Sequence, residues 1–174
     1  HVVDGVQSEG ETISSTRVRY MLEEGAVAEA RRLLGRHYAV GGVVRYGAQR
    51  GRQLGFRTAN LRIGQVCGCP SDGAYAVWGR HDDAWIPGVA NLGRRPSFDL
   101  GERLLEVHLM GYAGSLYGKH LRVLFVARLR SERRFDDASQ LIEQVHQDMV
   151  QARSTLEQNP PLDVTLCGAP DTTN

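Results

Sequence analysis

The spacing of hydrophobic residues divides the chain into a helical start, a β-rich middle and a helical end. Between residues 18 and 22, apolar side chains recur at helical intervals after a run of hydroxyl residues, which predicts a short helix with a hydroxyl N-cap. Residues 26–34 predict a second short helix, because Gly35 follows them and glycine commonly ends a helix. Residues 1–12 lack such a period and are expected to be irregular.

The middle of the chain has the alternating pattern of β-strands. No helical segment of ten or more residues interrupts it, which excludes a parallel sheet built from βαβ units. The pattern therefore predicts a mainly β fold, either an antiparallel barrel or a sandwich. Strands are predicted at 38–46, 58–63, 73–79, 84–92, 104–111 and 120–130.

After Phe135 the apolar residues return to a helical period and form one stripe, with Gln, Glu and Asp opposite. We expect a long helix that starts at Asp136 or Asp137 as N-cap, ends at Asn159-Pro160-Pro161 and packs its apolar face on the β-structure. Residues 161–174 are expected to be a poorly ordered tail. The stripe consists of Ala138, Leu141, Ile142, Val145, Met149, Ala152 and Leu156.

Composition is that of a globular domain, but charge is distributed unevenly. The 174 residues include 21 basic and 20 acidic side chains. Residues 17–62 hold ten arginines against three glutamates, whereas residues 131–174 hold three arginines against eight acids. The basic part indicates an anion site, although mixed surface charge explains the composition equally well. No run of 18 apolar residues and no secretory signal is present, and Cys67, Cys69 and Cys167 form no disulfide framework, so we expect a cytoplasmic protein without a membrane span.

Several common catalytic motifs are missing from the sequence. There is no Walker phosphate loop, no Gly-x-Gly-x-x-Gly after a strand, no Gly-x-Ser-x-Gly and no His-Glu-x-x-His. These absences argue against the standard nucleotide-binding folds and against serine hydrolases.

The segment 41–60 is the strongest positive feature. Glycines at 47, 51 and 55 let backbone amides approach a bound anion, and Arg50 and Arg52 add positive charge. Thr58 and Asn60 alternate on a predicted strand, so both side chains project to one side. A hydroxyl and an amide oxygen together suit a Mg²⁺ ion that also takes phosphate oxygens. A flexible hairpin loop explains the segment about as well.

Two further features carry candidate chemistry. Glu106 and His108 project to the opposite face from the leucines and valine of an apolar strand, 104–109. Glu106 is therefore either a solvent-facing residue or a catalytic base, and His108 is a structural or solvent-side residue. The charged segment 128–135, which ends in Phe135, marks the junction between the last strand and the long helix.

Taken together, motifs spread over residues 13–153 resemble the riboflavin kinase module of bacterial bifunctional riboflavin kinase/FAD synthetases. The matching segments include Gly51-Arg52-Gln53-Leu54-Gly55-Phe56-Arg57-Thr58-Ala59-Asn60, Gly88-Val89-Ala90-Asn91-Leu92-Gly93-Arg94-Arg95-Pro96-Ser97-Phe98, Glu106-Val107-His108-Leu109, Leu116-Tyr117-Gly118-Lys119 and Leu129-Arg130-Ser131-Glu132-Arg133-Arg134-Phe135. The resemblance implies a six-stranded antiparallel Greek-key barrel with a C-terminal helix.

The resemblance also implies an activity, which is phosphoryl transfer from ATP to the ribityl 5′-hydroxyl of riboflavin with Mg²⁺ as cofactor and FMN as product. In this reading Thr58 and Asn60 hold the metal, and Glu106 is the base that accepts the hydroxyl proton. We expect the apolar slot for the flavin ring near the barrel mouth, at Arg130, Glu132 and Phe135. The residues expected to bind ATP phosphates are Gly47, Arg50, Gly51, Arg52, Gly55 and Asn91.

One position departs from the family motif Pro-Thr-Ala-Asn, because Arg57 stands where the family has proline. Arginine removes the fixed φ that proline would impose and adds charge beside the expected phosphates. Arg57 therefore either assists ATP binding or leaves the loop less organised. A catalytically weakened barrel that binds flavin or nucleotide is the alternative function.

The resemblance divides the chain into residues 1–24, 25–160 and 161–174. The first part is similar to the last motif of an FMN adenylyltransferase module plus a linker helix, with Ser15, Thr16 and Arg17 as vestiges of that site. The rest of such a module is absent here, so we expect no FAD synthesis from this chain alone and attachment to that module in the full-length protein. Small-molecule substrates are the expected partners. A nucleic-acid-binding barrel is disfavoured because Tyr46 and Phe56 are the only aromatic residues among the arginines at 45–62.

Overall fold

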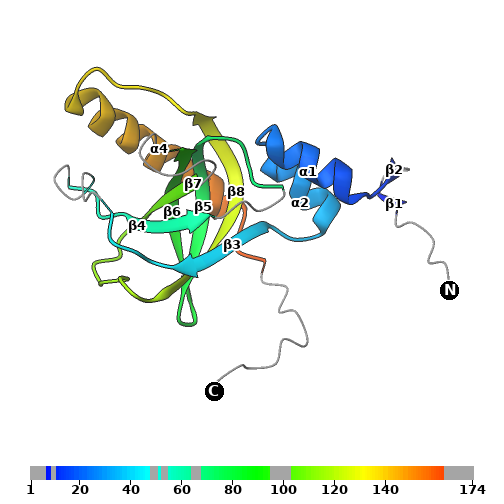
Figure 1. Cartoon of the computed structure of the whole chain (residues 1–174), viewed down its shortest axis with the longest axis horizontal. Helices are drawn as coiled ribbons and strands as arrows, with labels where there is room; N and C mark the ends of the chain where they lie inside the picture. Colours follow the sequence, from blue (N-terminus) through cyan, green and yellow to red (C-terminus); the bar gives the residue numbers. More distant parts are fainter. Residues whose placement is uncertain are drawn as a thin grey trace.

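The computed structural model describes residues 7–8, 11–47, 51, 55–63, 68–94 and 103–162. Two short helices precede a barrel of six strands, and one long helix follows it (Figure 1). The elements before the barrel are β1 (Gln7–Ser8), β2 (Glu11–Thr12), α1 (Ser15–Glu23) and α2 (Val27–Leu34). The barrel and the helix that follows it comprise β3 (Tyr38–Val43), β4 (Ala59–Ile63), β5 (Gly73–His81), β6 (Ala84–Arg94), β7 (Arg103–Leu109), β8 (His120–Ser131) and α4 (Ala138–Gln158).

The six strands form one antiparallel sheet in the order β3-β8-β5-β6-β7-β4. The two edge strands approach each other, and an isolated bridge between Arg45 and Asn60 closes most of the remaining gap. This arrangement confirms the predicted antiparallel barrel and excludes the sandwich. The placement of β3 beside β8 and of β4 beside β7 is the long-range pairing expected of a Greek-key barrel.

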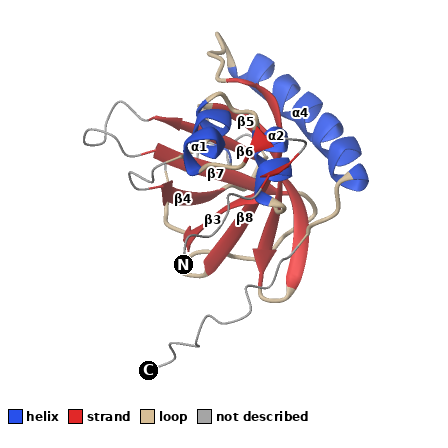
Figure 2. Ribbon diagram, turned by 90° about the vertical axis from the view of Figure 1, so that its right-hand side faces the viewer, coloured by secondary structure: helices blue, strands red, loops and turns tan. Residues whose placement is uncertain are grey.

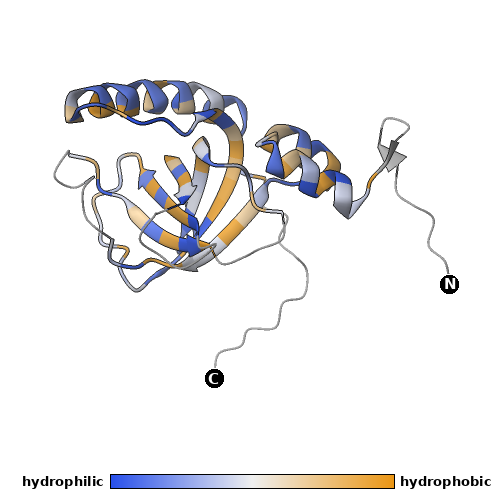
Figure 3. Ribbon diagram, turned by 45° about the horizontal axis from the view of Figure 1, so that its top comes forward, coloured by the Kyte–Doolittle hydropathy of each residue, from blue (hydrophilic) through white to orange (hydrophobic). Residues whose placement is uncertain are grey.

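The barrel interior is filled with apolar side chains that alternate with outward-facing residues along each strand. This alternation is visible as hydrophobic and hydrophilic bands on the strands in Figure 3. The central residues include Tyr75, Leu92, Leu105, Val107 and Phe125, each at most 1% exposed. Because the interior is packed, Asn60 and Glu106 lie on the outward faces of their strands, opposite Leu61 and Leu105.

Helix α4 crosses the outer face of the barrel, which leaves a second, smaller core between them (Figure 2). Ala152 and Leu156 of the helix are buried against Ala76, Val89 and Val126. The apolar stripe was thus predicted correctly, but only its C-terminal half is deeply covered, and Ala138 is exposed.

One acidic residue of α4 departs from the prediction. Asp148 was placed with the polar residues opposite the stripe, yet it is 3% exposed. The prediction failed because α4 is covered over a wider face than its apolar residues mark, and Asp148 meets an arginine of β8 there.

The ends of the helices follow the sequence signals. Ser14 Oγ accepts a hydrogen bond from Arg17 N, Gly35 adopts a left-handed φ of 65° after α2, and Asp137 caps α4 through Gln140 N. The lead-in differs from its prediction, since β1 and β2 pair as a two-residue antiparallel ladder that is too short to leave a sequence pattern. Within the described part of the chain, no helix combines the length and the hydrophobicity that a membrane crossing requires.

Candidate active site on the outer face of the barrel

Three polar residues lie side by side on adjacent strands. Asn60 of β4 is the direct partner of Glu106 of β7, and Glu106 is in turn the partner of Asn91 of β6. Opposite residues of an antiparallel ladder project to the same face of the sheet. The structure therefore brings Asn60, Glu106 and Asn91, which are far apart in sequence, into one row on the outer face.

A second row lies beside the first. Thr58 directly precedes β4 and lines the same cavity as Asn60, and His108 shares the side of Glu106 on β7. Thr58, Asn60, Glu106 and His108 thus form a four-residue patch, which we call the polar patch. The patch lies on the outside of the barrel beside α4, since the interior is occupied by the core.

The amide of Asn60 is buried and only half satisfied. Its Nδ2 donates a long hydrogen bond of 3.4 Å to Thr58 O, but its Oδ1 has no hydrogen-bond partner among the described residues, although Asn60 is 5% exposed. An acceptor oxygen left without a donor in a buried position is costly, by about 1–3 kcal/mol. A hard cation such as Mg²⁺ would satisfy this oxygen, so the residues present fit the predicted metal role.

Two glycines of the basic loop are required by space around these side chains. A Cβ at Gly47 would lie 2.5 Å from Asn60 Oδ1, and one at Gly51 would lie 2.6 Å from Phe56 O and 3.4 Å from Thr58 Oγ1. The backbone at Gly47 therefore rests directly on the Asn60 amide, whereas Gly51 is required by the Phe56 carbonyl and is in ordinary contact with Thr58. Gly55 instead needs its glycine for a positive φ of 88°. Arg50 and Arg52 lie outside the described residues.

A cavity of about 200 Å³ opens next to the polar patch. Arg57, Thr58 and Asn60 form its polar wall. This volume is below the range of about 300–1,000 Å³ that is usual for whole small-molecule sites. Its apolar lining is formed by Val44, Val107, Leu109, Tyr112, Leu116 and Tyr117.

Contacts on three sides hold the segment that leads into Thr58. Arg57 Nη1 donates to Ala113 O at 2.8 Å, and the carbonyl of Arg57 lies 2.9 Å from His108 Nδ1. The Phe56 ring packs edge-on against His108 and against His146 of α4, with centroid distances of 5.7 Å and 5.3 Å. Arg57, the departure from the family motif, is therefore engaged with the 111–117 loop.

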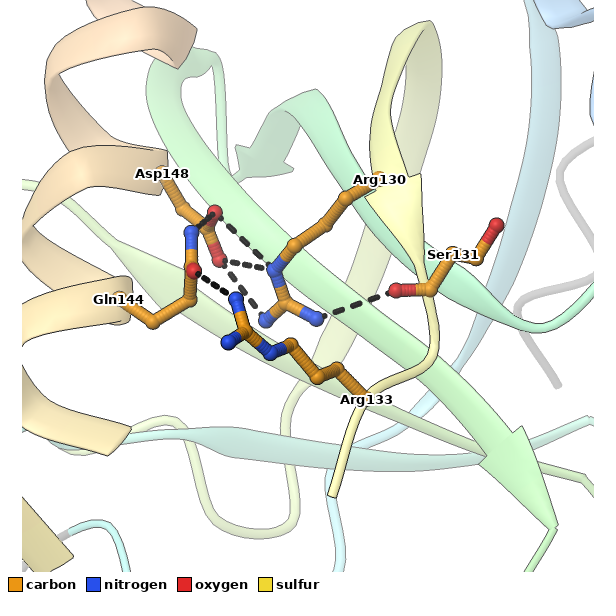
Figure 4. A network of polar contacts seen from close by, with 5 residues as sticks. All are labelled: Arg130, Ser131, Arg133, Gln144 and Asp148. Carbon is orange, nitrogen blue, oxygen red and sulfur yellow. Dashed lines mark hydrogen bonds and ion pairs between the residues drawn. The ribbon is translucent and has the colours of Figure 1, made fainter. Parts of the chain in front are cut away.

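At the far end of the row, Arg130 is fixed by a buried ion pair with α4 (Figure 4). Its Nε lies 3.0–3.1 Å from both carboxylate oxygens of Asp148, and its Nη2 lies 2.9 Å from Asp148 Oδ2. Gln144 donates to the same carboxylate at 2.9 Å and accepts from Arg133 at 3.2 Å. This network joins the end of β8 to the middle of α4.

The three residues predicted to bind the flavin ring lie in or beside this network. The guanidinium groups of Arg130 and Arg133 lie 5.6 Å and 5.7 Å from the centroid of the Phe135 ring, within reach of a cation–π contact. The Glu132 carboxylate lies over Gly93 of β6, because a Cβ there would be 2.9 Å from Glu132 Oε1 and 3.7 Å from Asn91 Nδ2. The described structure thus places Arg130, Glu132 and Phe135 on the side of Glu106 away from Asn60.

Sequence reasoning missed several residues of this region. His108 was predicted to be a structural or solvent-side residue, and its contact with the Arg57 carbonyl is structural, but that partner was not predicted. Asp148 and Gln144 were assigned to a solvated helix face. The only available signal was a cluster of arginines at 128–134 that needed an acidic partner.

Comparison with known proteins gives consistent matches. A profile of the family described as "Flavokinase: Riboflavin kinase" matches residues 34–156. The bifunctional riboflavin kinase/FMN adenylyltransferase of Escherichia coli (strain K12) is 40% identical over 146 residues, covering 83% of this chain and 46% of that protein. The chain therefore spans about half the length of the curated relatives it matches.

Two solved structures share the fold. One, titled as a macrolide-efflux protein from Streptococcus pneumoniae, has a TM-score of 0.79 at 34% identity. The match covers 87% of this chain and 50% of the chain in that structure. The riboflavin kinase from Trypanosoma brucei has a TM-score of 0.54 at 21% identity, covering 70% of this chain and 80% of its own, and supports the fold alone.

Proposed function

Because the chain belongs to the riboflavin kinase family, we propose that it transfers the γ-phosphoryl group of ATP to the ribityl 5′-hydroxyl of riboflavin, giving FMN and ADP. The observation that carries this proposal is the pairing of Asn60 with Glu106. The buried Oδ1 of Asn60 has no hydrogen-bond donor in the described structure. Phosphoryl transfer needs a positioned acceptor hydroxyl and stabilised phosphate charge, and the two sides of this pair suit these two tasks.

Thr58 and Asn60 are the proposed Mg²⁺ ligands. When bound, the ion would neutralise charge on the phosphate oxygens and orient them. Among the described residues, Asn60 Oδ1 has no hydrogen-bond donor, and Gly47 leaves room for the loop backbone to lie on the Asn60 side chain. Both ligands are neutral, so most of the countercharge in the complex would come from the phosphates themselves.

Glu106 is the proposed general base. Its carboxylate would accept the proton of the 5′-hydroxyl as the oxygen forms its bond to the γ-phosphorus and the bond to the β–γ bridging oxygen breaks. Its position between Asn60 and Asn91 supports this role, because the acceptor hydroxyl must meet the phosphate beside the metal ligands. A general base of this kind contributes about 10²–10⁴-fold to the rate.

The two substrates would approach Glu106 from opposite sides. The cavity lined by Val44, Tyr112 and Tyr117 suits the apolar faces of the nucleobase, with phosphates extending toward Gly47, Gly51 and Gly55. Arg50 and Arg52 remain predicted phosphate contacts, and so does Asn91, although it lies on the flavin side of Glu106. The flavin ring would bind near Arg130, Glu132 and Phe135, where a charged and aromatic surface lies beside Asn91.

The chain alone is proposed to make FMN but not FAD. The bifunctional relatives are about twice as long, and the match to them leaves their other half uncovered. We infer that this domain is attached to an FMN adenylyltransferase module in its full-length protein. Incubation with FMN, ATP and Mg²⁺ should therefore yield no FAD by chromatography, and FAD formation would contradict this part of the proposal.

The kinase activity itself is tested with purified chain, riboflavin, ATP and Mg²⁺, by following FMN on reversed-phase chromatography. FMN formation that is abolished by omission of ATP supports the proposal. Tight riboflavin binding by fluorescence quenching, without FMN after hours, would instead favour the weakened binding barrel. Arg57 does not favour that alternative here, because its guanidinium anchors the loop to Ala113.

A further inference from the structure

His108 makes a connection between the two halves of the polar patch. Its Nδ1 lies 2.9 Å from the carbonyl oxygen of Arg57, the residue directly before Thr58. A carbonyl only accepts hydrogen bonds, so this contact requires the proton on Nδ1. His108 lies on β7, the strand that carries Glu106, and it thereby holds the backbone directly before Thr58.

This contact lies where the backbone ladder stops. The pairing of β4 with β7 begins at Ala59 opposite Val107, so Arg57 and Thr58 lie beyond its last residue pair. The next tie between the two segments is the His108 side chain. The His108 contact thus adds a tie to β7 beyond the end of the ladder, directly before Thr58.

Aromatic packing reinforces the same segment. Phe56 meets the His108 ring edge-on at 5.7 Å and the His146 ring of α4 at 5.3 Å. The Arg57 guanidinium reaches Ala113 O on the other side. His108 is the member of this group that shares a strand and a face with Glu106.

We propose that His108 is a positioning residue that sets the distance between the Thr58 segment and Glu106. The inference rests on the proposed function for its catalytic consequence but concerns a contact of this chain that is measurable without substrate. The proposed metal ligand and the proposed base come from different strands, and small displacements between such groups reduce rates strongly. His108 would act through Arg57 and Thr58 and would not touch substrate.

The test compares His108→Asn with His108→Leu. The Asn amide nitrogen occupies nearly the position of Nδ1 and keeps the donor, whereas Leu keeps bulk and removes it. Hydrogen exchange of the peptide 55–61, followed by mass spectrometry on the free protein, should be roughly 2- to 12-fold faster in the Leu variant, as expected for the loss of one hydrogen bond. The Asn variant should exchange at the wild-type rate, and so should His120→Leu, a control at the exposed start of β8.

Kinetics supply the second readout. The Leu variant should lower kcat and raise KM for MgATP, with KM for riboflavin nearly unchanged, and the Asn variant should restore both parameters. Wild-type exchange in the Leu variant, or equal defects in the Leu and Asn variants, would overturn the inference. If the wild-type protein makes no FMN, the proposed function fails, while the exchange comparison still decides the role of His108.

Discussion

Asn60 and Glu106 are direct partners across β4 and β7, so a buried amide and a carboxylate from distant parts of the sequence occupy one spot on the barrel surface. The amide side has an oxygen without a donor in the described structure, and the carboxylate side adjoins Asn91 and the arginine-rich end of β8. In the proposed mechanism, this pairing places the proposed metal ligand and the proposed base at neighbouring positions. It allows each function to be removed separately by mutation.

Replacing Glu106 by Gln should lower kcat by about 10²- to 10⁴-fold, because the amide cannot accept the hydroxyl proton. The size and hydrogen-bonding shape of the side chain are nearly kept, so riboflavin and MgADP should bind within a few-fold of wild type. Steady-state FMN formation and isothermal titration measure the two effects. Near-normal turnover in Glu106→Gln would remove this residue from the mechanism.

Replacing Gly47 by Ala should displace the Asn60 side chain, since the new Cβ would lie 2.5 Å from its Oδ1. We expect the Mg²⁺ concentration for half-maximal activity to rise several-fold, with a smaller effect on riboflavin KM. The measurement is FMN formation over a Mg²⁺ titration at saturating ATP.

Gly42→Ala is the matched control for this change, because a Cβ on Gly42 would meet only Leu61 Cδ2 at the ordinary distance of 3.4 Å. Both variants add one methyl group to the same part of the chain. An unchanged Mg²⁺ requirement in Gly47→Ala, or an equal shift in both variants, would contradict a metal role for Asn60.

Local sequence signals were sufficient for the elements but not for the assembly of the site. Hydroxyl and acidic N-caps, the glycine after α2 and strand alternation act over a few residues. The N-cap was therefore narrowed to a hydroxyl run for α1 and to Asp136 or Asp137 for α4, and Gly35 was correctly predicted to end α2. The Asn60–Glu106 pairing depends on strand register, which is set by the whole barrel. Strand alternation predicted the face on which each residue lies. Which residue lies beside it on the next strand could be predicted only through the family resemblance.

The roles of Asp148 and His108 could not be predicted because their partners come from other elements. Helical period places Asp148 on a face, but its burial follows from Arg130 at the end of β8. His108 meets a backbone carbonyl, and a carbonyl leaves no trace in the residue types. Polar contacts between elements of this kind depend on tertiary structure alone.

The Arg130–Asp148 pair should be a major link between α4 and the barrel. Asp148→Ala would leave the Arg130 guanidinium partly buried without its counterion, so the free energy of unfolding should fall by about 3–5 kcal/mol. Urea denaturation followed by circular dichroism measures this change. Gln147→Ala, on the exposed side of the same helix, should change it by less than about 0.5 kcal/mol.

The double change Arg130→Met with Asp148→Leu tests the same pair without an orphaned charge. Apolar replacement of a buried ion pair is often neutral or stabilising, so stability should recover much of the loss seen in Asp148→Ala. Riboflavin KM should still rise, because Arg130 is a proposed flavin contact. Full recovery of both stability and riboflavin KM would limit the pair to a structural role.

Stability should also depend on pH through His37, which directly precedes β3 and is 1% exposed. Desolvation by burial, and secondarily the Arg31 charge, lowers the pKa of this histidine below its usual 6.5, and neither ring nitrogen has a hydrogen-bond partner of normal geometry among the described residues. Backbone groups of Pro160 and Phe125 offset part of the pKa shift. The folded protein therefore keeps His37 neutral at a pH where the unfolded chain protonates it.

The direction of this pH dependence follows from proton binding, because the unfolded state holds more protons than the folded state once the pH drops below about 6.5. The free energy of unfolding should be unaffected by His37 above that pH and should fall by up to about 1.4 kcal/mol per pH unit below it, until the folded-state pKa is reached. Urea denaturation at pH 7.5, 6.5 and 5.5 measures this slope. His37→Leu should flatten it, whereas His120→Leu, which removes an exposed histidine, should leave it unchanged. An identical slope in wild type and His37→Leu would assign the acid sensitivity to other groups.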